Sequence, residues 1–284
     1  MKIALYPNFL KPNALECAVK TCDILNELGA EVYAGETFRE SFSEKPYVKY
    51  EDIRESAKSA DFVIAIGGDG TILRCARRLM GTDTKLLGIN TGTLGFMAGL
   101  EADRLDRLES LFTGDYEISE RMTLDAVYTA DGCEEVYTAL NEVSVRSGSF
   151  RIADFDICSD GFLVGKYRAD GVLFSTPSGS TAYALSAGGP VIEPDLECIE
   201  MTQICPHSLF SRTTLFSAER KLKITCRTAE NEYMTASIDG WKQIKLCRNE
   251  SLEVHRGKYK IKFVNPIKNS FHDSICKKLC KPLK

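Results

Sequence analysis

The chain has 284 residues, which is enough for one large domain or two medium ones. Hydrophobic residues make up 44% and charged residues 27%, as in ordinary soluble globular proteins. The formal net charge of −4 argues against a nucleic-acid-binding protein, and no apolar stretch approaches the ~18 residues of a membrane span. The start of the chain lacks the pattern of a signal peptide, so we expect a cytoplasmic protein.

The first part of the chain alternates between short apolar runs and helical patterns. This alternation predicts a parallel sheet that is buried on both faces. The expected strands are 2–6, 31–34, 62–66 and 85–89, and the expected helices are 14–28, 51–59, 72–80 and 105–112.

From Glu120 the pattern changes to short runs rich in β-branched residues, with turn residues between them. This pattern predicts an all-β domain of the sandwich type. The expected strands are 123–129, 135–145, 155–159, 162–167, 172–175, 221–227, 235–239, 243–246, 251–256 and 260–264. We therefore expect an α/β domain over 1–119 and a β-sandwich over 120–265. The last stretch, 266–284, contains a helical pattern over 271–279 and is expected to return to the first domain.

A glycine-rich turn follows the third strand and leads directly into a helix. Gly67, Gly68 and Gly70 surround Asp69, and the helix that follows carries Arg74 and Arg77 in its first turns. Open α/β sheets bind ligands at the carboxyl ends of their strands, and a helix N-terminus favours an anion. Asp69 is a candidate general base, a metal ligand or a helix cap.

A second glycine-rich turn, 90–96, follows the next strand, beginning at Asn90. Because sequential strands tend to be neighbours, we expect this turn to lie beside the first.

Within the all-β part, Asn141 and Glu142 interrupt an otherwise apolar run. An amide that donates and accepts, next to a carboxylate that accepts, suits a ribose diol or an adenine edge. The alternative is one exposed residue of an alternating strand and one bulge.

The run 172–174 reads as a buried strand, and the turn after it, Ser175 to Thr181, is rich in hydroxyl side chains around Pro177 and Gly179. A short helical pattern over 183–186 follows. A strand, such a turn and a helix start together favour a site for a phosphate or a sugar. The alternative is a Ser/Thr-rich surface loop.

Eleven cysteines are scattered along the chain without a Cys-x-x-Cys pair, so buried free thiols are the simplest interpretation. Cys276 and Cys280, four residues apart in a helical pattern, are best explained by packing. The three histidines are expected to be structural, and Asp239–Gly240 reads as a hairpin turn.

Four motifs occur in one order along the chain, and together they resemble those of the NAD kinase family. They are Gly67–Thr71, Asn90–Phe96, Asn141–Glu142 and Asp170–Tyr183, and 205–209 also resembles the family's pattern. The resemblance covers nearly the whole chain, and the long Ser/Thr/Gly segment is its most specific part. It implies a Rossmann-like α/β domain joined to a β-sandwich, in a homodimer or homotetramer.

The resemblance also implies an activity: phosphoryl transfer from ATP, or polyphosphate, to the 2′-hydroxyl of the adenosine ribose of NAD. Asp69 would be the catalytic residue, orienting the hydroxyl and accepting its proton late, because that hydroxyl is a weak acid. Mg²⁺ would be carried by the triphosphate rather than by a protein cage. The residues implied in binding NAD or nucleotide are Gly67, Gly68, Gly70, Thr71, Arg74, Asn90, Asn141, Glu142, Arg168, Asp170, Ser178, Thr181, Ala182, Tyr183, Ala184, Leu185 and Ser186.

One departure from the family's pattern is Trp241, which stands where the family often has Gln. Asp170 would lie beside the nicotinamide amide or a ribose of a neighbouring molecule.

Two alternative functions stay open. A lipid kinase of the diacylglycerol type also carries Gly-Gly-Asp-Gly, and a non-catalytic dinucleotide-binding regulator would use the same pocket.

Overall fold

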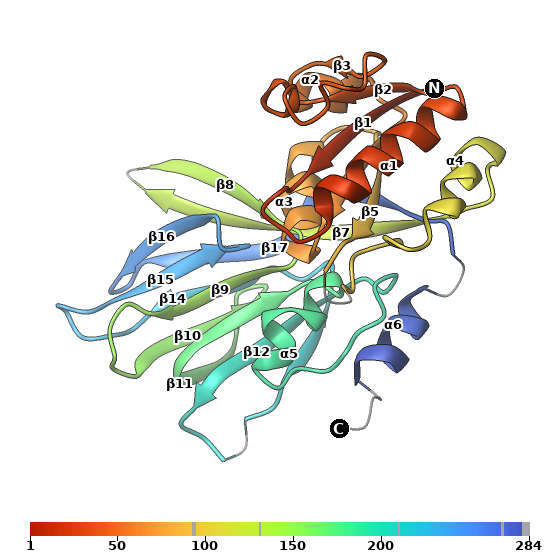
Figure 1. Ribbon diagram of the computed structural model, residues 1–284. Coiled ribbons are helices and arrows are strands. Elements are labelled where there is room, and N and C mark those ends of the chain that lie inside the picture. Colours follow the sequence, from red (N-terminus) through yellow and green to blue (C-terminus); the bar gives the residue numbers. More distant parts are fainter. Residues whose placement is uncertain (93–94, 131, 210, 268–269, 280–284) are drawn as a thin grey trace. The chain divides into compact units, whose positions relative to one another are not determined.

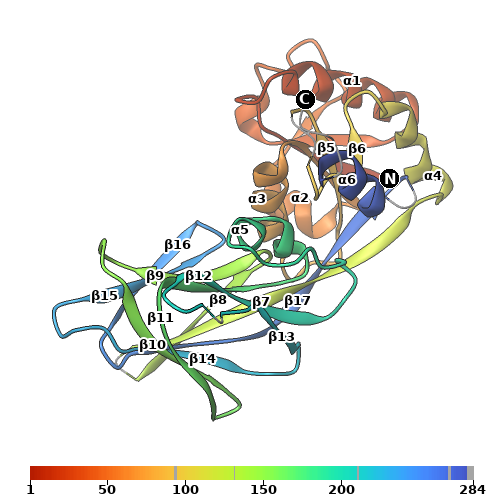
Figure 2. The same cartoon turned by 90° about the horizontal axis from the view of Figure 1, so that it is seen from below.

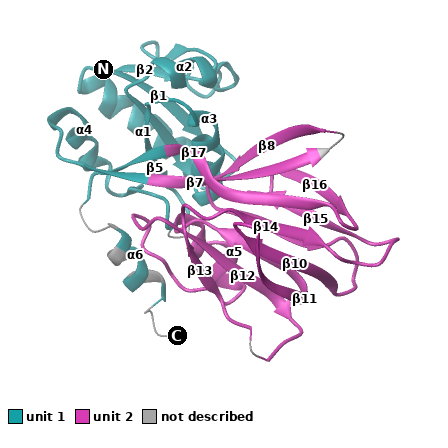
Figure 3. Ribbon diagram, turned by 180° about the vertical axis from the view of Figure 1, so that it is seen from behind, with its two compact units in different colours: residues 1–120, 261–284 teal, residues 121–260 magenta. Residues whose placement is uncertain are grey.

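The computed structural model describes residues 1–92, 95–130, 132–209, 211–267 and 270–279. The chain divides into two units, which Figure 3 distinguishes by colour. The first unit comprises residues 1–120 and 261–284, and the second comprises residues 121–260. In the part of the chain that is described, no helix is long and apolar enough to cross a membrane.

The first unit is built on a parallel sheet in the order β3-β2-β1-β4-β5-β6. Figure 1 labels β1, β2, β3 and β5 of this sheet. Its strands are β1 (Lys2–Pro7), β2 (Glu31–Ala34), β3 (Lys49–Tyr50), β4 (Phe62–Gly67), β5 (Lys85–Asn90) and β6 (Leu100–Glu101). All six residues of β4 are buried, as expected for a strand covered on both faces. The strand order reverses between β1 and β4, so this is the Rossmann-like arrangement, and ligands bind such sheets at that reversal.

The helical segments of the first unit are α1 (Ala14–Glu27), η1 (Glu36–Phe38), α2 (Ile53–Ser59), α3 (Asp69–Leu79), η2 (Leu105–Glu109), α4 (Ser110–Thr113) and α6 (Ser270–Leu279). η1 had no expected counterpart, and two of the expected helices differ clearly from expectation. α3 begins at Asp69, three residues before the expected start. The expected helix 105–112 is instead a 3₁₀ segment followed by one α-helical turn. α6 belongs to the first unit, and Cys280, the expected neighbour of Cys276, lies outside the described residues.

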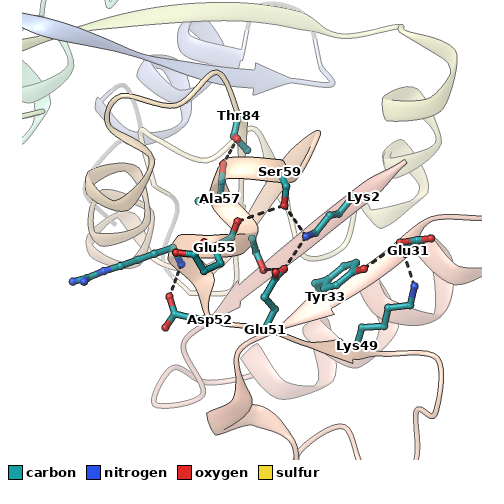
Figure 4. A network of polar contacts seen from close by, with 12 residues as sticks. Lys2, Glu31, Tyr33, Lys49, Glu51, Asp52, Glu55, Ala57, Ser59 and Thr84 are labelled. Carbon is teal, nitrogen blue, oxygen red and sulfur yellow. Dashed lines mark hydrogen bonds and ion pairs between the residues drawn. The ribbon is translucent and has the colours of Figure 1, made fainter.

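Polar contacts attach α2 to β1 of the sheet. The ammonium group of Lys2 donates to Glu51 Oε2 and to Ser59 Oγ, each at 2.7 Å. Asp52 caps α2 by accepting a hydrogen bond from the N–H of Arg54 at 2.8 Å. Figure 4 shows these bonds, of which the two from Lys2 connect β1 to Glu51 and to the last residue of α2. The bond to Asp52 lies within the start of the helix itself.

The second unit is a β-sandwich (Figure 2). Its strands pair antiparallel along β16-β15-β9-β11-β12-β13 and along β11-β10-β14-β17. The strands are β7 (Glu117–Ala130), β8 (Cys133–Ala139), β9 (Glu142–Ser147), β10 (Ala153–Ser159), β11 (Phe162–Ser175), β12 (Cys198–Pro206), β13 (Thr214–Ser217), β14 (Leu222–Cys226), β15 (Tyr233–Ile238), β16 (Lys242–Cys247) and β17 (Ser251–Asn265). Phe155 and Phe174 are among the largest side chains of the shared core.

Long strands account for most differences from the expected pattern in this part of the chain. The runs 162–167 and 172–175 form the single strand β11, whose first half pairs with β10 and whose second half pairs with β9. The runs 251–256 and 260–264 likewise form β17. The expected strand 135–145 is instead divided into β8 and β9, and β12 and β13 had no expected counterpart. The fold class, an α/β domain with a β-sandwich, is as the sequence predicts.

Candidate functional site

In the first unit, the two glycine-rich turns lie side by side. β4 and β5 are adjacent and parallel, with Gly67 opposite Asn90, and the N–H of Thr91 donates to Gly67 O at 3.2 Å. The amide of Asn90 is used within the turn, because its Nδ2 donates to Glu101 Oε2 at 2.8 Å and its Oδ1 accepts from the N–H of Gly92 at 3.2 Å. Asn90 therefore shapes the turn. Thr93 and Leu94 of the second motif lie outside the described residues.

Asp69 is the first residue of α3, and it does not act as that helix's N-cap, which is Gly68. Its carboxylate instead reaches the second turn. Oδ2 accepts from the N–H of Phe96 at 2.9 Å, and Oδ1 accepts from the N–H of Met97 at 3.3 Å. The carboxylate is thus held at the carboxyl edge of the sheet, beside the N-terminus of a helix, which is where this fold class binds anionic ligands.

Gly95 permits this arrangement, because a Cβ built on it would overlap the Asp69 carboxylate. Gly68 and Gly70 differ from Gly95, since a Cβ at either would meet nothing within 4 Å. The space above these two glycines is open to a ligand. Thr71 connects the turn to its surroundings: its hydroxyl accepts from Asn8 Nδ2 at 3.0 Å and from Arg74 Nη2 at 3.3 Å.

In the second unit, Asn141 and Glu142 lie at the break between β8 and β9, and Asp239 holds this break in place. The Asp239 carboxylate accepts from three consecutive N–H groups, those of Leu140 at 2.7 Å, Asn141 at 2.9 Å and Glu142 at 3.0 Å. Asp239 adopts a positive φ of 44°. Our expectation that Asp239–Gly240 is simply a hairpin turn was incomplete, because the aspartate also anchors the candidate binding segment.

Two side-chain oxygens at this break, Oδ1 of Asn141 and Oε2 of Glu142, are buried and have no hydrogen-bond partner among the residues that the structure describes. Burial raises the pKa of Glu142 to about 8, and the nearby charge of Asp239 adds to the effect. The carboxyl is therefore largely neutral at pH 7, so it can donate a hydrogen bond as well as accept one. Buried polar atoms normally have partners, and an adenine edge or a ribose hydroxyl offers what these two lack.

The hydroxyl-rich turn is bonded mostly to itself and to the break. The Ser175 hydroxyl donates to Asn141 O at 3.2 Å, and the Thr176 hydroxyl donates to Leu140 O at 2.6 Å. The Ser180 hydroxyl donates to Pro177 O at 2.7 Å. These three side chains are fully buried. They fix the backbone of the turn and are not presented to a ligand as we expected.

The segment after this turn is a 3₁₀ helix, η3 (Ser178–Thr181), followed by α5 (Tyr183–Ser186). Ser178 and Thr181 are half-buried, and Ser178 Oγ lies 3.4 Å from a guanidinium nitrogen of Arg121. Ala184 is buried against Leu173 of β11 and Ile204 of β12, with Tyr183 packed beside them. Ala182 and Leu185 are half-buried and Ser186 is exposed, so α5 offers one packed face and one accessible face.

Arg168 and Asp170 do not join this cluster. Both are exposed on β11, and at ~3.3 Å per residue they lie roughly 17–23 Å along the strand from Ser175. The Arg168 side chain points to Asp154, with Nε 3.8 Å from the carboxylate. Within one copy of the chain, the second unit therefore gathers Asn141, Glu142 and the segment 178–186, and it leaves Arg168 and Asp170 apart.

Sequence reasoning missed three residues around these sites: Gly95, Asp239 and Glu200. Glu200 on β12 is fully buried, and its Oε1 accepts from the Thr202 hydroxyl at 2.7 Å. Its Oε2 has no hydrogen-bond partner within the described ranges of the chain. Burial raises its pKa to about 7. A Cβ at Gly189 would overlap its carboxyl group, so the turn after α5 packs directly on it. For Glu200, a carboxylate within a largely apolar run was the available signal in the sequence.

Comparison with known proteins matches both halves of the chain. The ATP-NAD kinase N-terminal domain matches residues 3–116, and the ATP-NAD kinase C-terminal domain matches residues 140–266. An NAD kinase of Citrifermentans bemidjiense is 31% identical over 281 residues, covering 98% of each chain. An NAD kinase of Natranaerobius thermophilus is 34% identical over 280 residues, covering 98% of this chain and 97% of that protein.

Solved structures share the fold. Yeast NADH kinase in complex with NADH superposes with a TM-score of 0.90 at 24% identity, covering all of this chain and 89% of that one. An NAD kinase from Archaeoglobus fulgidus in complex with ATP gives 0.76 at 24% identity, covering 96% of each chain. Both family domains are matched in order, and relatives are more than 30% identical over 98% of the chain, so this chain belongs to the NAD kinase family, a family of phosphotransferases.

Proposed function

We propose that this chain phosphorylates NAD, transferring the γ-phosphoryl group of ATP to the 2′-hydroxyl of the adenosine ribose to give NADP. The observation that carries the proposal is the Asp69 carboxylate, which two backbone N–H groups hold at the carboxyl edge of a Rossmann-like sheet. Membership of the NAD kinase family and the relatives solved with NADH and with ATP support the choice of substrates. Polyphosphate is the alternative donor.

In this proposal, Asp69 orients the ribose hydroxyl and accepts its proton. The bond between the γ-phosphorus and the β–γ bridging oxygen breaks, that oxygen leaves with ADP, and a new bond forms to the 2′-oxygen. Phosphoryl transfer passes through a loose transition state, so most of the catalysis is positioning and charge neutralisation. The fixed Asp69 carboxylate supplies the positioning.

Asn141 and Glu142 are proposed to bind the adenosine part of NAD through their unpartnered oxygens. The other proposed NAD- or nucleotide-binding groups are the glycine turn of the first unit with Thr71, Arg74 and Asn90, the residues Arg168 and Asp170, and the residues Ser178 and 181–186 of the second unit. We also propose the functional domains 1–119 with 266–284, and 120–265.

A divalent cation, Mg²⁺, is proposed to arrive with the triphosphate. Among the residues that the structure describes, no three His, Cys, Asp or Glu side chains lie together in a way that would hold a metal ion. An ion bound mainly by phosphate oxygens needs few protein ligands. Mg²⁺ would neutralise charge on the phosphates during transfer.

We further propose a homodimer or homotetramer in the cytoplasm. Arg168 and Asp170 are exposed on β11, far from the Ser175 end of that strand, where Asn141 lies. They are therefore available to NAD that is bound by a neighbouring copy of the chain. The cysteines that the structure describes are free thiols, which suits a reducing compartment.

The test is to incubate the purified protein with NAD, ATP and Mg²⁺ and to assay NADP with an NADP-specific dehydrogenase. Asp69→Asn should retain NAD binding while turnover falls ~10²-fold or more. Unchanged turnover would remove Asp69 as the catalytic residue. No NADP with either ATP or polyphosphate would contradict the proposed reaction, and lipid alcohols would be the next substrates to try.

A further inference from the structure

A carboxyl group is buried beneath the turn that follows α5 in the second unit. It belongs to Glu200 of β12, which is fully buried and which none of the roles proposed above uses. A Cβ built on Gly189 would overlap its Oε1, so the backbone of the turn 187–189 packs directly on this group. The position of the turn therefore depends on the carboxyl group beneath it.

The same face of β12 supports α5. Ile204 lies on the face that carries Glu200, because side chains four residues apart in a strand point the same way. Together with Leu173 of β11, Ile204 packs against Ala184 of α5 (Figure 1). The N–H of Gly189 donates to Ala184 O at 2.9 Å, so the turn is also bonded to α5. A displacement of the turn would therefore displace α5.

Glu200 is also adjacent to the break between β8 and β9. It lies directly opposite Ser175 of β11. Opposed residues of antiparallel strands point to the same face, with Cβ atoms about 5 Å apart. The Ser175 hydroxyl donates to the backbone oxygen of Asn141, a residue proposed to bind NAD, at 3.2 Å. Glu200 thus lies between two parts of the proposed NAD site, α5 and the break.

The hydrogen bonds of Glu200 favour a neutral carboxyl group. Its Oε1 accepts from the Thr202 hydroxyl at 2.7 Å, and its Oε2 has no partner in the stretches of chain that the structure describes. Burying a carboxylate with a single hydroxyl donor is unfavourable, because its charged oxygens lose their water. Burial raises the pKa of Glu200 to about 7, and the Thr202 hydroxyl lowers it by a smaller amount.

The elements around Glu200 offer little to stabilise a charge. On its own strand lies Cys198, a thiol whose pKa is raised by burial and then by the charge of Glu200. The residues opposite Glu200 are Ser175 on β11 and Leu215 on β13. The turn 187–189 consists of alanine and glycine. These neighbours supply no positive charge, so ionisation of Glu200 favours a state in which water reaches it.

The turn is the part of this surrounding that moves most easily. β12 is paired on both sides, with β11 and with β13. The N–H groups of residues 187–189 instead donate to carbonyl oxygens of α5. A short segment with few bonds opens at a lower free energy than a strand paired on both sides. Water therefore reaches an ionised Glu200 when the turn lifts away from it.

We propose that Glu200 is a positioning residue for NAD binding: its neutral carboxyl group holds the turn 187–189 and α5 in place, and its ionisation loosens both. NAD affinity therefore falls as Glu200 loses its proton. The effect on NAD rests on the proposed function, in which residues 181–186 contact NAD. The loosening of the turn does not depend on that function.

Calorimetric titration of the full chain with NAD, without ATP, at pH 6, 7 and 8 tests this role. The dissociation constant of the parent, divided by that of Glu200→Gln, should rise about 10-fold from pH 6 to pH 8, because pH 8 is one unit above the pKa of Glu200. Glu142, whose pKa is also raised, is present in both proteins and cancels in this ratio. Glu193→Gln, at an exposed carboxylate, is the matched control and should follow the parent.

Gly189→Ala is a second variant, which keeps the ionisable group. Its Cβ would push the turn away from Glu200, so NAD should bind about 10-fold more weakly at pH 6, the effect of about one lost hydrogen bond. The difference from the parent should shrink toward pH 8, where the parent has itself lost the contact. A role of Glu200 in folding alone would not produce this pH dependence.

Hydrogen exchange of the Gly189 amide, measured without NAD, reports on the turn directly. After correction for the intrinsic rate, its protection should fall about 10-fold from pH 6 to pH 8 in the parent and stay constant in Glu200→Gln. Two results would overturn the inference: the same pH dependence of NAD affinity in the parent and in Glu200→Gln, or parent-like NAD affinity in Gly189→Ala.

The exchange measurement separates this inference from the proposed function. If the parent binds no NAD, the proposed function fails, and the Gly189 amide then decides alone whether Glu200 holds the turn. Protection that falls with pH in the parent but not in Glu200→Gln would support that role. Equal protection in both proteins at every pH would contradict it.

Discussion

The carboxylate of Asp69 accepts a hydrogen bond from the N–H of Phe96 at 2.9 Å, although the two residues are 27 positions apart. This bond joins the loops that follow two neighbouring parallel strands, β4 and β5. It fixes the orientation of the side chain that we propose as the catalytic group, and the absence of a side chain at Gly95 makes room for it. The second glycine turn therefore positions the functional group of the first.

Gly95→Ala should lower turnover by ~10-fold or more, because the new Cβ would displace the Asp69 carboxylate by an ångström or so. NAD affinity should change much less than turnover. Gly92→Ala in the same loop is the matched control, since a Cβ there meets nothing within 4 Å. The measurement is kcat and KM for NADP formation in both variants, and equal kcat values for the two would contradict the positioning role.

Asn141→Ala should raise the dissociation constant of NAD by roughly 10-fold, the effect of losing about one hydrogen bond to a buried ligand atom. The reason is that Oδ1 of Asn141 is buried and has no hydrogen-bond partner in the described part of the chain. Calorimetric titration with NAD measures the effect, and the thermal midpoint controls for folding. A dissociation constant equal to that of the parent would remove Asn141 from the site.

Asp239→Asn should destabilise the protein by about 1–3 kcal/mol and also weaken NAD binding, because an amide cannot accept all three N–H groups that converge on this carboxylate. Urea unfolding and NAD titration provide the two readouts. The control is Asp106→Asn, which alters an exposed pair with Arg104 and should change stability by less than ~1 kcal/mol. If Asp239→Asn changed stability and NAD binding as little as this control, the proposed anchoring role of Asp239 would be wrong.

Glu200→Gln should change how stability depends on pH. The folded pKa of Glu200, about 7, lies above its ordinary value of 4.5. Below pH 4.5 the carboxyl group is protonated in both the folded and the unfolded state, so it does not lower the free energy of unfolding. Between pH 4.5 and 7 the unfolded state releases the proton first, so stability falls as pH rises, and above pH 7 the cost levels off at about 3 kcal/mol.

The glutamine variant should therefore gain stability over the parent as pH rises from 4.5 to 8, with the two similar at pH 4.5. Urea unfolding at several pH values gives the difference in free energy of unfolding between the variant and the parent. The contribution of Glu142, whose pKa is also raised, cancels in this difference because both proteins carry it. Glu219→Gln, at an exposed carboxylate, is the control and should follow the parent. Parallel curves for parent and Glu200→Gln would show that burial does not shift this group.

Removing divalent cations with excess EDTA should abolish NADP formation and leave NAD binding intact. The expectation follows from the role proposed for Mg²⁺, that of an ion bound mainly by the phosphates of ATP. Adding back Mg²⁺ should restore the rate. Full activity in EDTA would contradict the metal's role, whereas loss of NAD binding would show that the ion also supports the NAD site.

The local pattern of the sequence determined where most elements lie and which motifs flank them. The run 62–66 followed by glycines predicted β4 and the turn holding Asp69, because a strand buried on both faces is continuously apolar. The adjacency of the two glycine turns followed from chain order alone. These features depend on local patterns and on the order of elements along the chain, so they can be recognised in the amino-acid sequence alone.

Only the tertiary structure decided which polar groups meet. The Asp239 carboxylate accepts hydrogen bonds from backbone N–H groups 97 to 99 positions earlier in the chain, at the break between β8 and β9. No local sequence pattern predicts a contact between such distant residues. Ser175 and Thr176 looked like ligand groups, yet their hydroxyls bond to the backbone of residues 140 and 141. The physical reason is that a buried polar group must be paired, and the partner that satisfies it is chosen by the packing of distant segments.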